Sequence, residues 1–463
     1  MGAATPYRVN RSYSSDELLE ESVLDKSVLI IGAGVAGLSA AHRLKSEGFE
    51  VTVLEAGGRI GGRASTDFFE DSLFDRGAQF LSDGYRNVCR LIDELGLRDD
   101  FRPSSQWNAI IKGGRGRAVS ASRPWSVSSS GLLGMKDAMK LASGSRQMIK
   151  ETEHLPLEDF SRWSDLDDAP ASAWLRKQFN EEILEYVFEP MVHGFYFQEP
   201  DEMSRALPAL LWNFGARNRQ PMALFGGMES LPDALAAGLD IRLRTPVETI
   251  EAAEDGVTVE AGEGRFSASR LILAVPAPVA RNLWTPDDEI ERALLATPYS
   301  PAVVMGLLIP DGLPKSSMPP DVHGIMFPRR ERRVLGSVVV VTRKCPIHVD
   351  QGELLNVMLS HADAMRLFEA PQDEIFAEVL SELEEYYPGL EERIDLVRVY
   401  RWRNAAACTP PGRCRNIQAY RSDSAEKKIF LAGDYMGTPN VEGAVESGLW
   451  AAGEVEKAVI GGV

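Results

Sequence analysis

The first part of the chain alternates between apolar runs and a segment with helical spacing. An apolar run at 28–31 precedes a glycine-rich stretch at 32–37, a helix-like segment at 38–45 and a second apolar run at 51–54. Short continuous apolar runs are typical of strands that are buried on both faces of a parallel sheet. This order therefore predicts a β-α-β unit within an α/β domain.

Further along the chain the pattern changes twice. The stretch from 85 to about 221 is mostly helical in spacing, whereas 241–275 and 302–401 contain runs typical of strands. Predicted strands lie at 241–249, 257–261, 265–275, 303–309, 336–341, 354–359 and 396–401. Predicted helices lie at 87–95, 136–150, 171–187, 362–368 and 373–386. Because 463 residues exceed the usual size of one hydrophobic core, we expect two domains.

Composition and charge disfavour several classes of protein and partner. Hydrophobic residues make up 44% and charged residues 25% of the chain, and the formal net charge is −18. That excess of acid disfavours nucleic acids and anionic membrane surfaces as partners. No apolar run reaches the length of a transmembrane segment. Residues 1–26 lack the apolar core of a signal peptide, so we expect a polar, mobile arm there.

The spacing of cysteines and histidines predicts no metal site. The four cysteines form no C-x-x-C pair, and the six histidines are scattered without the spacing of metal ligands. We therefore expect no bound metal and a reduced, cytoplasmic setting.

The glycine-rich stretch has the G-x-G-x-x-G spacing of a dinucleotide site. Gly32 permits a tight turn after the strand, Gly34 lets backbone approach a pyrophosphate, and Gly37 lets the helix pack near the strand. The helix N-terminus that follows offers N–H groups and partial positive charge to phosphates. Glu55, at the end of the second strand, is suited to accept hydrogen bonds from a ribose diol. The alternative is a plain glycine turn in another doubly wound domain.

Two further motifs identify the dinucleotide. Residues 55–63 read E-A-G-G-R-I-G-G-R and resemble the E-A-x-x-R-x-G-G-R signature of the flavin amine oxidase superfamily. Residues 432–434 and 442–452 are similar to the closing A-G-D and E-G-A-x-x-S-G-x-x-A-A motifs of that superfamily. NAD and FAD share the first glycine motif, so this resemblance implies FAD, bound without a covalent link.

The resemblance also implies roles for individual residues. The arginines and glycines of 59–63 would lie against the diphosphate, and Asp434 would bond the ribityl chain. The helix that starts at 441–444 would stabilise reduced flavin with its N-terminus, 77–80 would follow the flavin edge, and the Val247 backbone would contact adenine. A basic residue often follows Ala56 in relatives, but Gly57 stands there, so that contact is expected to be missing. The candidate FAD-binding residues are Gly32, Gly34, Val35, Ala36, Gly37, Glu55, Ala56, Arg59, Gly61, Gly62, Arg63, Gly77, Ala78, Gln79, Phe80, Val247, Gly433, Asp434, Val441 and Ala444.

The same resemblance implies the domain organisation. The G-G-M-x-x-L element at 226–231 is similar to the point where the superfamily's chain returns to its FAD domain. The implied architecture is an α/β, two-domain, FAD-binding Rossmann-type (GR2-like) fold. Its discontinuous FAD domain would comprise 27–85, 222–290 and 405–463, and its mixed α+β substrate domain 86–221 and 291–404.

Landmarks of the amine-oxidising members are missing. Alignment puts Met305 where those members carry a lysine, Asn440 where they carry one aromatic ring, and 405–408 (A-A-A-C) near the other ring. Segments 189–204 and 400–405 look more like the protoporphyrinogen oxidase and carotenoid or squalene desaturase branches. By this resemblance Met305, Arg401 and Trp402 are the candidate catalytic residues.

Single residues in these segments also have plainer explanations. His193, in an apolar helical stretch, is more often structural. Arg401 and Arg403 occupy alternate positions of a predicted strand, so only one of them can face a cavity. Trp402 is as well suited to the core as to a flavin, and Cys408 has the wrong spacing for a covalent tether.

We therefore expect an FAD-dependent oxidoreductase that takes a hydride from a hydrophobic small molecule, protoporphyrinogen-oxidase-like or desaturase-like. Oxidation of an amine or amino acid to an imine is the second reading, and an FAD-binding protein without turnover is the third. Oxygen, a quinone or another protein could accept the electrons, and no local motif chooses among them or sets the oligomeric state.

Overall fold

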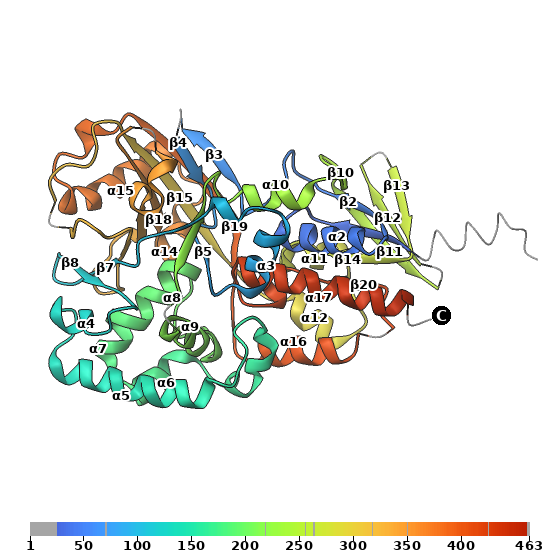
Figure 1. Ribbon diagram of the computed structural model, residues 1–463, viewed down its shortest axis with the longest axis horizontal. Coiled ribbons are helices and arrows are strands. Elements are labelled where there is room, and N and C mark those ends of the chain that lie inside the picture. Colours follow the sequence, from blue (N-terminus) through green and yellow to red (C-terminus); the bar gives the residue numbers. More distant parts are fainter. Residues whose placement is uncertain are drawn as a thin grey trace, which may run out of the picture.

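The computed structural model describes residues 26–460 except 70, 71, 218, 255, 263, 317, 350 and 425. The polar arm expected at 1–26 lies outside the described residues, apart from Lys26. The described chain forms two lobes side by side (Figure 1), each built around its own large sheet. No helix of the described chain is both long and apolar enough to cross a membrane.

The first lobe contains a five-stranded parallel sheet in the order β10-β2-β1-β14-β20. Ile30 of the central strand pairs with Val53 on one side and with Ile272 on the other, and all three side chains are fully buried. Burial on both faces explains the continuous apolar runs of the sequence. The strands are β1 (Ser27–Ile31), β2 (Glu50–Leu54), β10 (Asp240–Arg242), β14 (Arg270–Leu273) and β20 (Ile429–Leu431).

Helices cover both faces of this sheet. On one face α2 (Val35–Ser46) packs directly on α17 (Val441–Ile460), so closely that a side chain at Gly448 would overlap the carbonyl oxygen of Ala36. On the other face Leu431 N donates to the hydroxyl of buried Tyr420 at 2.9 Å. The remaining elements of this lobe are α10 (Ser230–Ala236), α11 (Ala277–Leu283), α12 (Glu289–Leu295), α16 (Arg413–Ser422), β11 (Val247–Ala253), β12 (Gly256–Ala261) and β13 (Gly264–Ala268).

The second lobe contains a seven-stranded sheet in the order β19-β15-β18-β17-β16-β7-β8. Neighbouring strands are antiparallel except β16 and β7, which are parallel. The strands are β7 (Asn108–Ile111), β8 (Gly116–Val119), β15 (Tyr299–Ile309), β16 (Gly324–Met326), β17 (Leu335–Val340), β18 (Glu353–Leu359) and β19 (Leu396–Ala407). One face packs on α15 (Gln372–Tyr386) and α14 (His361–Arg366). The other face turns toward β3, β4 and β5, and α13 (Val341–Lys344) lies on that side, since Val341 belongs to the cluster there and Lys344 pairs with Asp75 of β4.

A group of helices and short strands completes the second lobe and the junction between the lobes (Figure 1). The helices are α3 (Arg86–Glu94), α4 (Ser126–Ser129), α5 (Met135–Thr152), α6 (Ala171–Gln178), α7 (Glu181–Ile183), α8 (Glu189–Tyr196) and α9 (Ala206–Ala216). The short strands are β3 (Thr66–Phe69), β4 (Ser72–Asp75), β5 (Leu81–Ser82), β6 (Phe101–Pro103) and β9 (Pro221–Leu224).

The single helix predicted over 171–187 is wrong in detail, because the structure divides it. Helix α6 ends before Phe179, and Asn180 starts α7 by accepting a hydrogen bond from Ile183 N at 2.9 Å. A π-helical turn at Leu184–Phe188 then leads into α8. An asparagine side chain that caps a new helix competes with continuation of the old one.

Two predicted strands are also divided between sheets. The run at 241–249 becomes β10 and β11, separated by Arg244 at φ 54°, and 265–275 becomes β13 and β14. The mostly helical stretch also contains the β7–β8 hairpin, whose turn places Gly113 and Gly114 at positive φ. A Gly-Gly pair between alternating residues is itself a hairpin signal.

Candidate flavin and substrate site

The glycine turn after β1 leads into an open helix N-terminus. Gly32 has φ 103°, and a Cβ there would lie 2.7 Å from Ala274 O, while a Cβ on Gly37 would overlap Gly32 O. Beside Gly34, in contrast, no atom of the described residues other than its own chain neighbours lies within 4 Å of a Cβ position. Helix α2 begins at Val35 with no side-chain cap and no acid in its first turn. Its unpaired N–H groups and partial positive charge therefore face free space, as an anion site requires.

Glu55 lies beside this turn, as expected for a ribose acceptor. Its carboxylate accepts hydrogen bonds from Ala33 N at 2.8 Å and Gly57 N at 2.7 Å. A carboxylate has about four acceptor positions, so capacity remains for hydroxyl donors. The chain at 244–247, which leads to Val247 at the start of β11, runs alongside, since Arg244 N bonds Gly57 O and Thr245 N bonds Glu55 O.

Arg244 supplies a cation that the sequence did not predict at this place. Its guanidinium lies 3.3 Å from a Cβ position on Gly58, next to the Gly57 that replaces the family's basic residue. A side chain from the turn between β10 and β11 therefore brings positive charge to the same corner. The only signal in the sequence would have been a basic residue near the predicted adenine strand, and such residues are common.

The two arginines of the G-G-R segment have different partners. Arg59 is paired with Asp67 and Glu229 and also donates to Thr66 O at 2.7 Å. The structure therefore places Arg59 against β3 and the residue before α10, whereas the expected place was the diphosphate beside Gly34. The glycines between them are at positive φ, and Gly61 N donates to Ala33 O at 2.8 Å. Gly61 and Gly62 thus hold this segment against the first glycine turn.

Arg63 joins the beginning of the chain to its closing motif. Its guanidinium makes two hydrogen bonds to the Asp434 carboxylate, at 2.6 and 2.8 Å. Tyr299 OH and Ala407 N also donate to Asp434, at 2.6 and 3.2 Å. Burial alone would raise the pKa of Asp434, but the charge and hydrogen bonds of Arg63 outweigh it, and the pKa is lowered. Asp434 is therefore a fixed anion.

The N-terminus of α17 follows Gly433 and Asp434. Asn440 Oδ1 accepts from Gly443 N at 2.9 Å and so caps the helix that contains Val441 and Ala444. Tyr196, from α8, lies beside the Asn440 side chain, and burial raises the pKa of Tyr196 to about 12. An aromatic ring from a distant helix thus lies next to the position where amine-oxidising relatives carry one in sequence.

The segment 77–80 is held against the G-G-R segment. Ala78 N donates to Arg63 O at 2.9 Å, and a side chain on Gly77 would overlap the same oxygen. Gln79 Nε2 donates to Asp75 O at 2.8 Å, so the segment folds back on itself. Phe80 projects toward the second lobe, where its ring meets His323 edge-on at 5.0 Å.

A buried ion pair that the sequence did not predict anchors this segment. Lys344, at the end of α13, is 1% exposed and is paired with Asp75, which also accepts from Thr66 Oγ1 and Met228 N, both at 2.8 Å. The Lys344 ammonium lies 5.7 Å from the centre of the Phe80 ring. Sequence patterns give no warning of such a pair, because its members are 269 positions apart.

Two neutral histidines, His323 and His348, lie near the Lys344–Asp75 pair. Burial, reinforced by the charge of Lys344, lowers the pKa of His348, and burial lowers that of His323 to about 4. His348 Nε2 lies 2.7 Å from Leu224 O, so this nitrogen carries the proton.

The three candidate catalytic residues do not lie together. Met305, expected at the flavin, is fully buried on the face of β15 that packs on α15, whereas Val304 faces the opposite cluster. Arg401 is exposed and donates to Phe368 O and Ala370 O at 2.7 and 2.6 Å, away from that cluster. Only Trp402 belongs to it, donating to Arg76 O at 2.8 Å.

Several buried polar atoms around these segments have no hydrogen-bond partner in the described chain and could bond a polar cofactor. Buried side-chain atoms without a hydrogen-bond partner in the described chain include Ser65 Oγ, Gln79 Oε1, Tyr435 OH and Thr438 Oγ1. They belong to the segments after Arg63, before Phe80 and after Asp434. Together with the open helix N-terminus at Gly34, these unpaired atoms fit a cofactor that carries both phosphates and hydroxyl groups.

A second buried cluster lies between α8 and 327–333. His193 Nδ1 is 3.1 Å from Glu199, and Arg332 pairs with Glu189 and Glu199. Burial raises the pKa of Glu189 to about 7, while the pKa of Glu199 is lowered to about 2 because His193 and the arginines outweigh its burial. The three acid and imidazole groups lie within 4.8 Å of one another, but Arg332 already pairs with both carboxylates. His193 is thus a structural histidine of this cluster.

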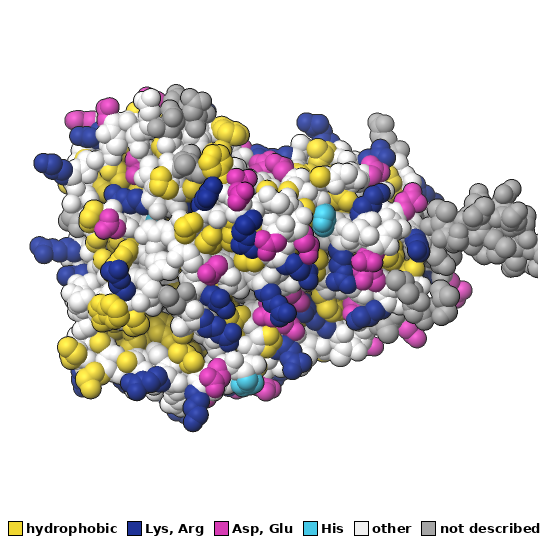
Figure 2. Space-filling view, viewed as in Figure 1, with side chains coloured by type: hydrophobic (Ala, Val, Ile, Leu, Met, Phe, Trp, Pro, Cys, Tyr) yellow, Lys and Arg dark blue, Asp and Glu magenta, His cyan; other side chains and the backbone are white. Residues whose placement is uncertain are grey.

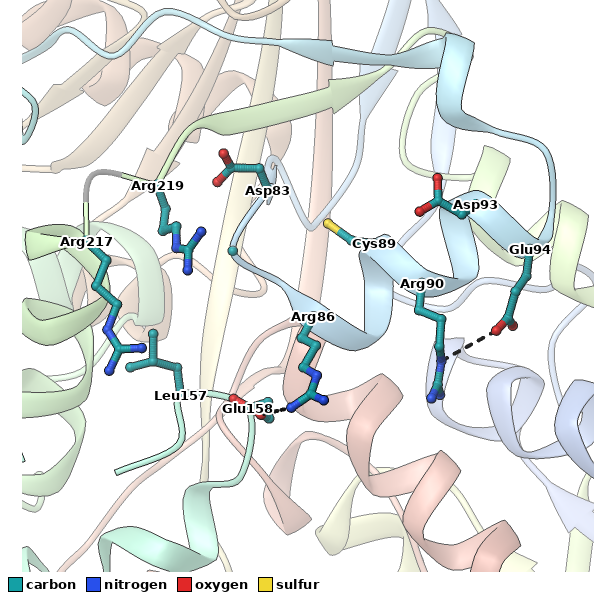
Figure 3. A pocket seen from close by; sticks show the side chains of 11 residues that line it. Asp83, Arg86, Cys89, Arg90, Asp93, Glu94, Leu157, Glu158, Arg217 and Arg219 are labelled. Carbon is teal, nitrogen blue, oxygen red and sulfur yellow. Dashed lines mark hydrogen bonds and ion pairs between the residues drawn. The ribbon is translucent and has the colours of Figure 1, made fainter. Parts of the chain in front are cut away.

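A cleft of about 530 Å³ opens on the surface beside α3 (Figure 3). Its wall contains no candidate FAD-binding residue. Arg86 and Glu158 pair across it at 2.9 Å, and Arg90 and Glu94 pair along α3 at 3.6 Å. Since its charges largely satisfy one another, the cleft offers no clear preference for a charged ligand.

Comparison with known proteins identifies the family. The family model described as flavin containing amine oxidoreductase matches residues 35–456, nearly the whole described chain. The chain belongs to this family. The family is one of flavin-containing oxidoreductases, as the motifs predicted, and the chain has the α/β two-domain FAD-binding fold of the family.

Individual relatives differ in what they are named for. Protoporphyrinogen oxidase 2 of Arabidopsis thaliana is 31% identical over 42% of this chain, but the match spans only 37% of that protein. The flavin-dependent L-tryptophan oxidase RebO of Lentzea aerocolonigenes is 26% identical over 93% of this chain and 98% of its own. The structure of cyclohexylamine oxidase from Brevibacterium oxydans has a TM-score of 0.74 at 20% identity, covering 94% of this chain and 99% of that one. At that identity the likeness shows the fold alone.

Proposed function

We propose that this flavin-containing oxidoreductase dehydrogenates a hydrophobic small molecule, as protoporphyrinogen oxidases and desaturases do. One observation carries the proposal: the sheet face that meets Phe80 and Trp402 is mostly apolar, with Ser337 and Asn356 as its buried polar members. Val304 and its neighbours Ala302, Leu308, Val339 and Met358 form that face, and β15 contains no lysine.

The chain's own residues divide the work between the two lobes. The α2 N-terminus at Gly34 would hold the diphosphate, Glu55 the ribose and Asp434 the ribityl hydroxyls, with the cofactor bound without a covalent link. FAD, when bound, supplies the group that accepts the hydride. The apolar face excludes water, and Phe80 and Trp402 orient the substrate against that face.

The arrangement around Tyr196 and Asn440 supports a second candidate. A tyrosine ring at that corner resembles half of an amine-guiding cage, and the L-tryptophan oxidase matches the chain nearly end to end. Oxidation of an amine or amino acid to an imine is therefore the alternative.

A direct comparison of substrates tests the two candidates. The purified holoprotein is mixed without oxygen with protoporphyrinogen, a polyene, benzylamine, putrescine or L-tryptophan, and bleaching of the flavin absorbance is followed. We expect the apolar substrates to reduce the flavin fastest. Faster reduction by any of the three amines would replace the first proposal with amine oxidation.

The electron acceptor and the setting belong to the same proposal. We propose oxygen, a quinone or a protein as acceptor, and a reduced, cytoplasmic compartment, since Cys89, Cys408 and Cys414 form no disulfide. The reduced enzyme is exposed to air or to a soluble quinone, and the return of the flavin absorbance is followed. Reoxidation by air indicates oxygen, reoxidation by the quinone alone indicates a quinone, and reoxidation by neither indicates a protein acceptor.

A further inference from the structure

Three large apolar side chains are exposed close together in the sequence of the second lobe. Trp125, just before α4, is 67% exposed, and Met135 and Met139, in the first two turns of α5, are 70% and 67% exposed. Because residues four apart stack on one side of a helix, Met135 and Met139 form a continuous apolar stripe. The two elements adjoin, since Leu133 N donates to Val127 O at 2.8 Å.

Basic side chains accompany these apolar ones. Segment 112–150 carries eight basic residues and one acid, so its formal charge is +7 in a chain of −18, which leaves −25 for the rest. Lys136 and Lys140 are exposed and lie one position after the two methionines, so a basic stripe runs beside the apolar stripe. Arg123, exposed next to Trp125, adds a further cation. We call Arg123, Trp125, Met135, Lys136, Met139 and Lys140 the α4–α5 patch.

The composition of the patch favours one kind of partner. Exposed tryptophan and methionine beside lysine are typical of helices that lie in a lipid–water interface, with the apolar groups below the headgroups and the cations among them. An acidic protein surface would engage the cations but would leave the apolar side chains in contact with polar groups. Figure 2 shows hydrophobic side chains gathered over the part of the molecule that contains α4 and α5, with Lys and Arg side chains around them.

We propose that the α4–α5 patch docks this protein on a membrane surface that carries anionic lipid headgroups. The docking is peripheral: Trp125 and the methionines enter the headgroup layer, while Lys136, Lys140 and Arg123 meet lipid phosphates. It is independent of the substrate proposed above, because none of these residues belongs to the cluster around Phe80 and Trp402.

Co-sedimentation with vesicles tests the proposal on the full-length holoprotein. We expect binding to vesicles of phosphatidylcholine and phosphatidylglycerol in equal parts, little binding to phosphatidylcholine alone, and loss of binding at high salt. K136E/K140E should weaken binding by at least about tenfold, since each basic residue near an anionic surface adds several-fold. W125S/M135S/M139S should weaken it as well.

Matched variants and an alternative probe keep the test decisive. K45E and M365S change exposed residues elsewhere and should bind as the unchanged protein does, and the flavin absorbance reports that every variant is folded. Equal binding to both vesicle types, or unchanged binding by both patch variants, would overturn the proposal. Polyglutamate is the alternative probe. If the protein binds polyglutamate as tightly as it binds vesicles, and W125S/M135S/M139S does not weaken that binding, the partner of the patch is an acidic protein instead.

Discussion

Glu55 is the residue whose position most closely matches its expected role. It accepts hydrogen bonds from two backbone N–H groups that border the open side of Gly34. The same carboxylate therefore shapes the turn and is available to a ribose.

Glu55→Ala should reduce FAD retention more than it changes substrate affinity. The variant loses the ribose acceptor and leaves Ala33 N and Gly57 N without their partner, at a cost of about 1–3 kcal/mol. Gly34→Val should be worse, because its side chain fills the space expected for the pyrophosphate. Flavin occupancy after gel filtration at low free FAD is the measurement, with exposed Glu50→Ala as the control. Full occupancy in either variant would refute the assignment.

Lys344→Met should strongly destabilise the fold, although Lys344 lies in none of the sequence motifs. It leaves Asp75 charged and buried without its partner, which costs about 3–5 kcal/mol. The pKa of Asp75 is lowered in the unchanged protein, because Lys344 outweighs burial, so its stabilising effect is present above the carboxyl's ordinary pKa and is lost in acid. In Lys344→Met that pKa should rise, and the deficit in urea unfolding should shrink from pH 7 to pH 5. Asp75→Asn/Lys344→Met should recover part of the loss, and a deficit that does not depend on pH would contradict this account.

Val304 and Met305 provide a matched pair for the substrate face. Val304→Phe adds bulk to the cluster around Trp402 and should slow anaerobic flavin reduction several-fold. Met305→Leu, on the α15 side, conserves volume and should leave the rate unchanged at a stability cost below about 1.5 kcal/mol. If Met305→Leu slowed flavin reduction and Val304→Phe did not, Met305 rather than Val304 would lie at the flavin.

These residues show what sequence reasoning could and could not reach. Glycine turns and the acid after β2 are local signals, so their geometry was predictable. Met305 was placed by alignment, and a shift of one position in a strand reverses the face on which a side chain lies. Lys344 and Arg244 act through contacts with distant segments, which no local pattern encodes.

At the scale of elements, α8 joins the helical part of the second lobe to its large sheet. The buried cluster of Glu189, His193, Glu199 and Arg332 lies at that contact. The prediction of a single helix over 171–187 failed for the same reason that local propensity often fails: Asn180 caps a new turn, and tertiary packing on the sheet decides where α8 begins.

Glu189→Gln should change the pH dependence of stability in one direction. Burial raises the pKa of Glu189 to about 7 in the folded protein. Its contribution to stability is therefore full below its unfolded pKa of 4.5 and is lost as pH rises through 7. The variant should gain about 1–3 kcal/mol relative to the unchanged protein between pH 5 and pH 8. Thermal unfolding across this range is the measurement, exposed Glu153→Gln is the control, and a difference that stays constant would contradict the assignment.

At the scale of the whole molecule, the two lobes meet along the segments expected to hold the flavin. The large-scale division was predictable because the motifs alternate with long stretches of different periodicity. The net charge of −18 averages over the chain and includes a segment, 112–150, whose formal charge is +7.

FAD should be released when the protein is denatured in acid. The Cys408 thiol lies 3.3 Å from Ser300 Oγ, and burial raises its pKa, so it is a protonated thiol rather than a nucleophile. Flavin fluorescence should stay in the supernatant after acid precipitation, and Cys408→Ala should retain FAD before it. Fluorescence that remains with the precipitated polypeptide would show a covalent bond.

The pairing of Arg63 with Asp434 has a consequence for how the protein is made. The two residues are 371 positions apart, so at a synthesis rate of about 5–20 residues per second roughly 20–70 s pass between their appearance on the ribosome. For most of that interval β1 has no β14 to pair with. For all of it the sheet lacks β20 and the covering helix α17. The glycine turn is thus among the first parts made, yet cofactor loading must wait until nearly the whole chain has left the ribosome. A nascent chain stalled before β20 should expose the apolar face of α2 and be recognised by chaperones.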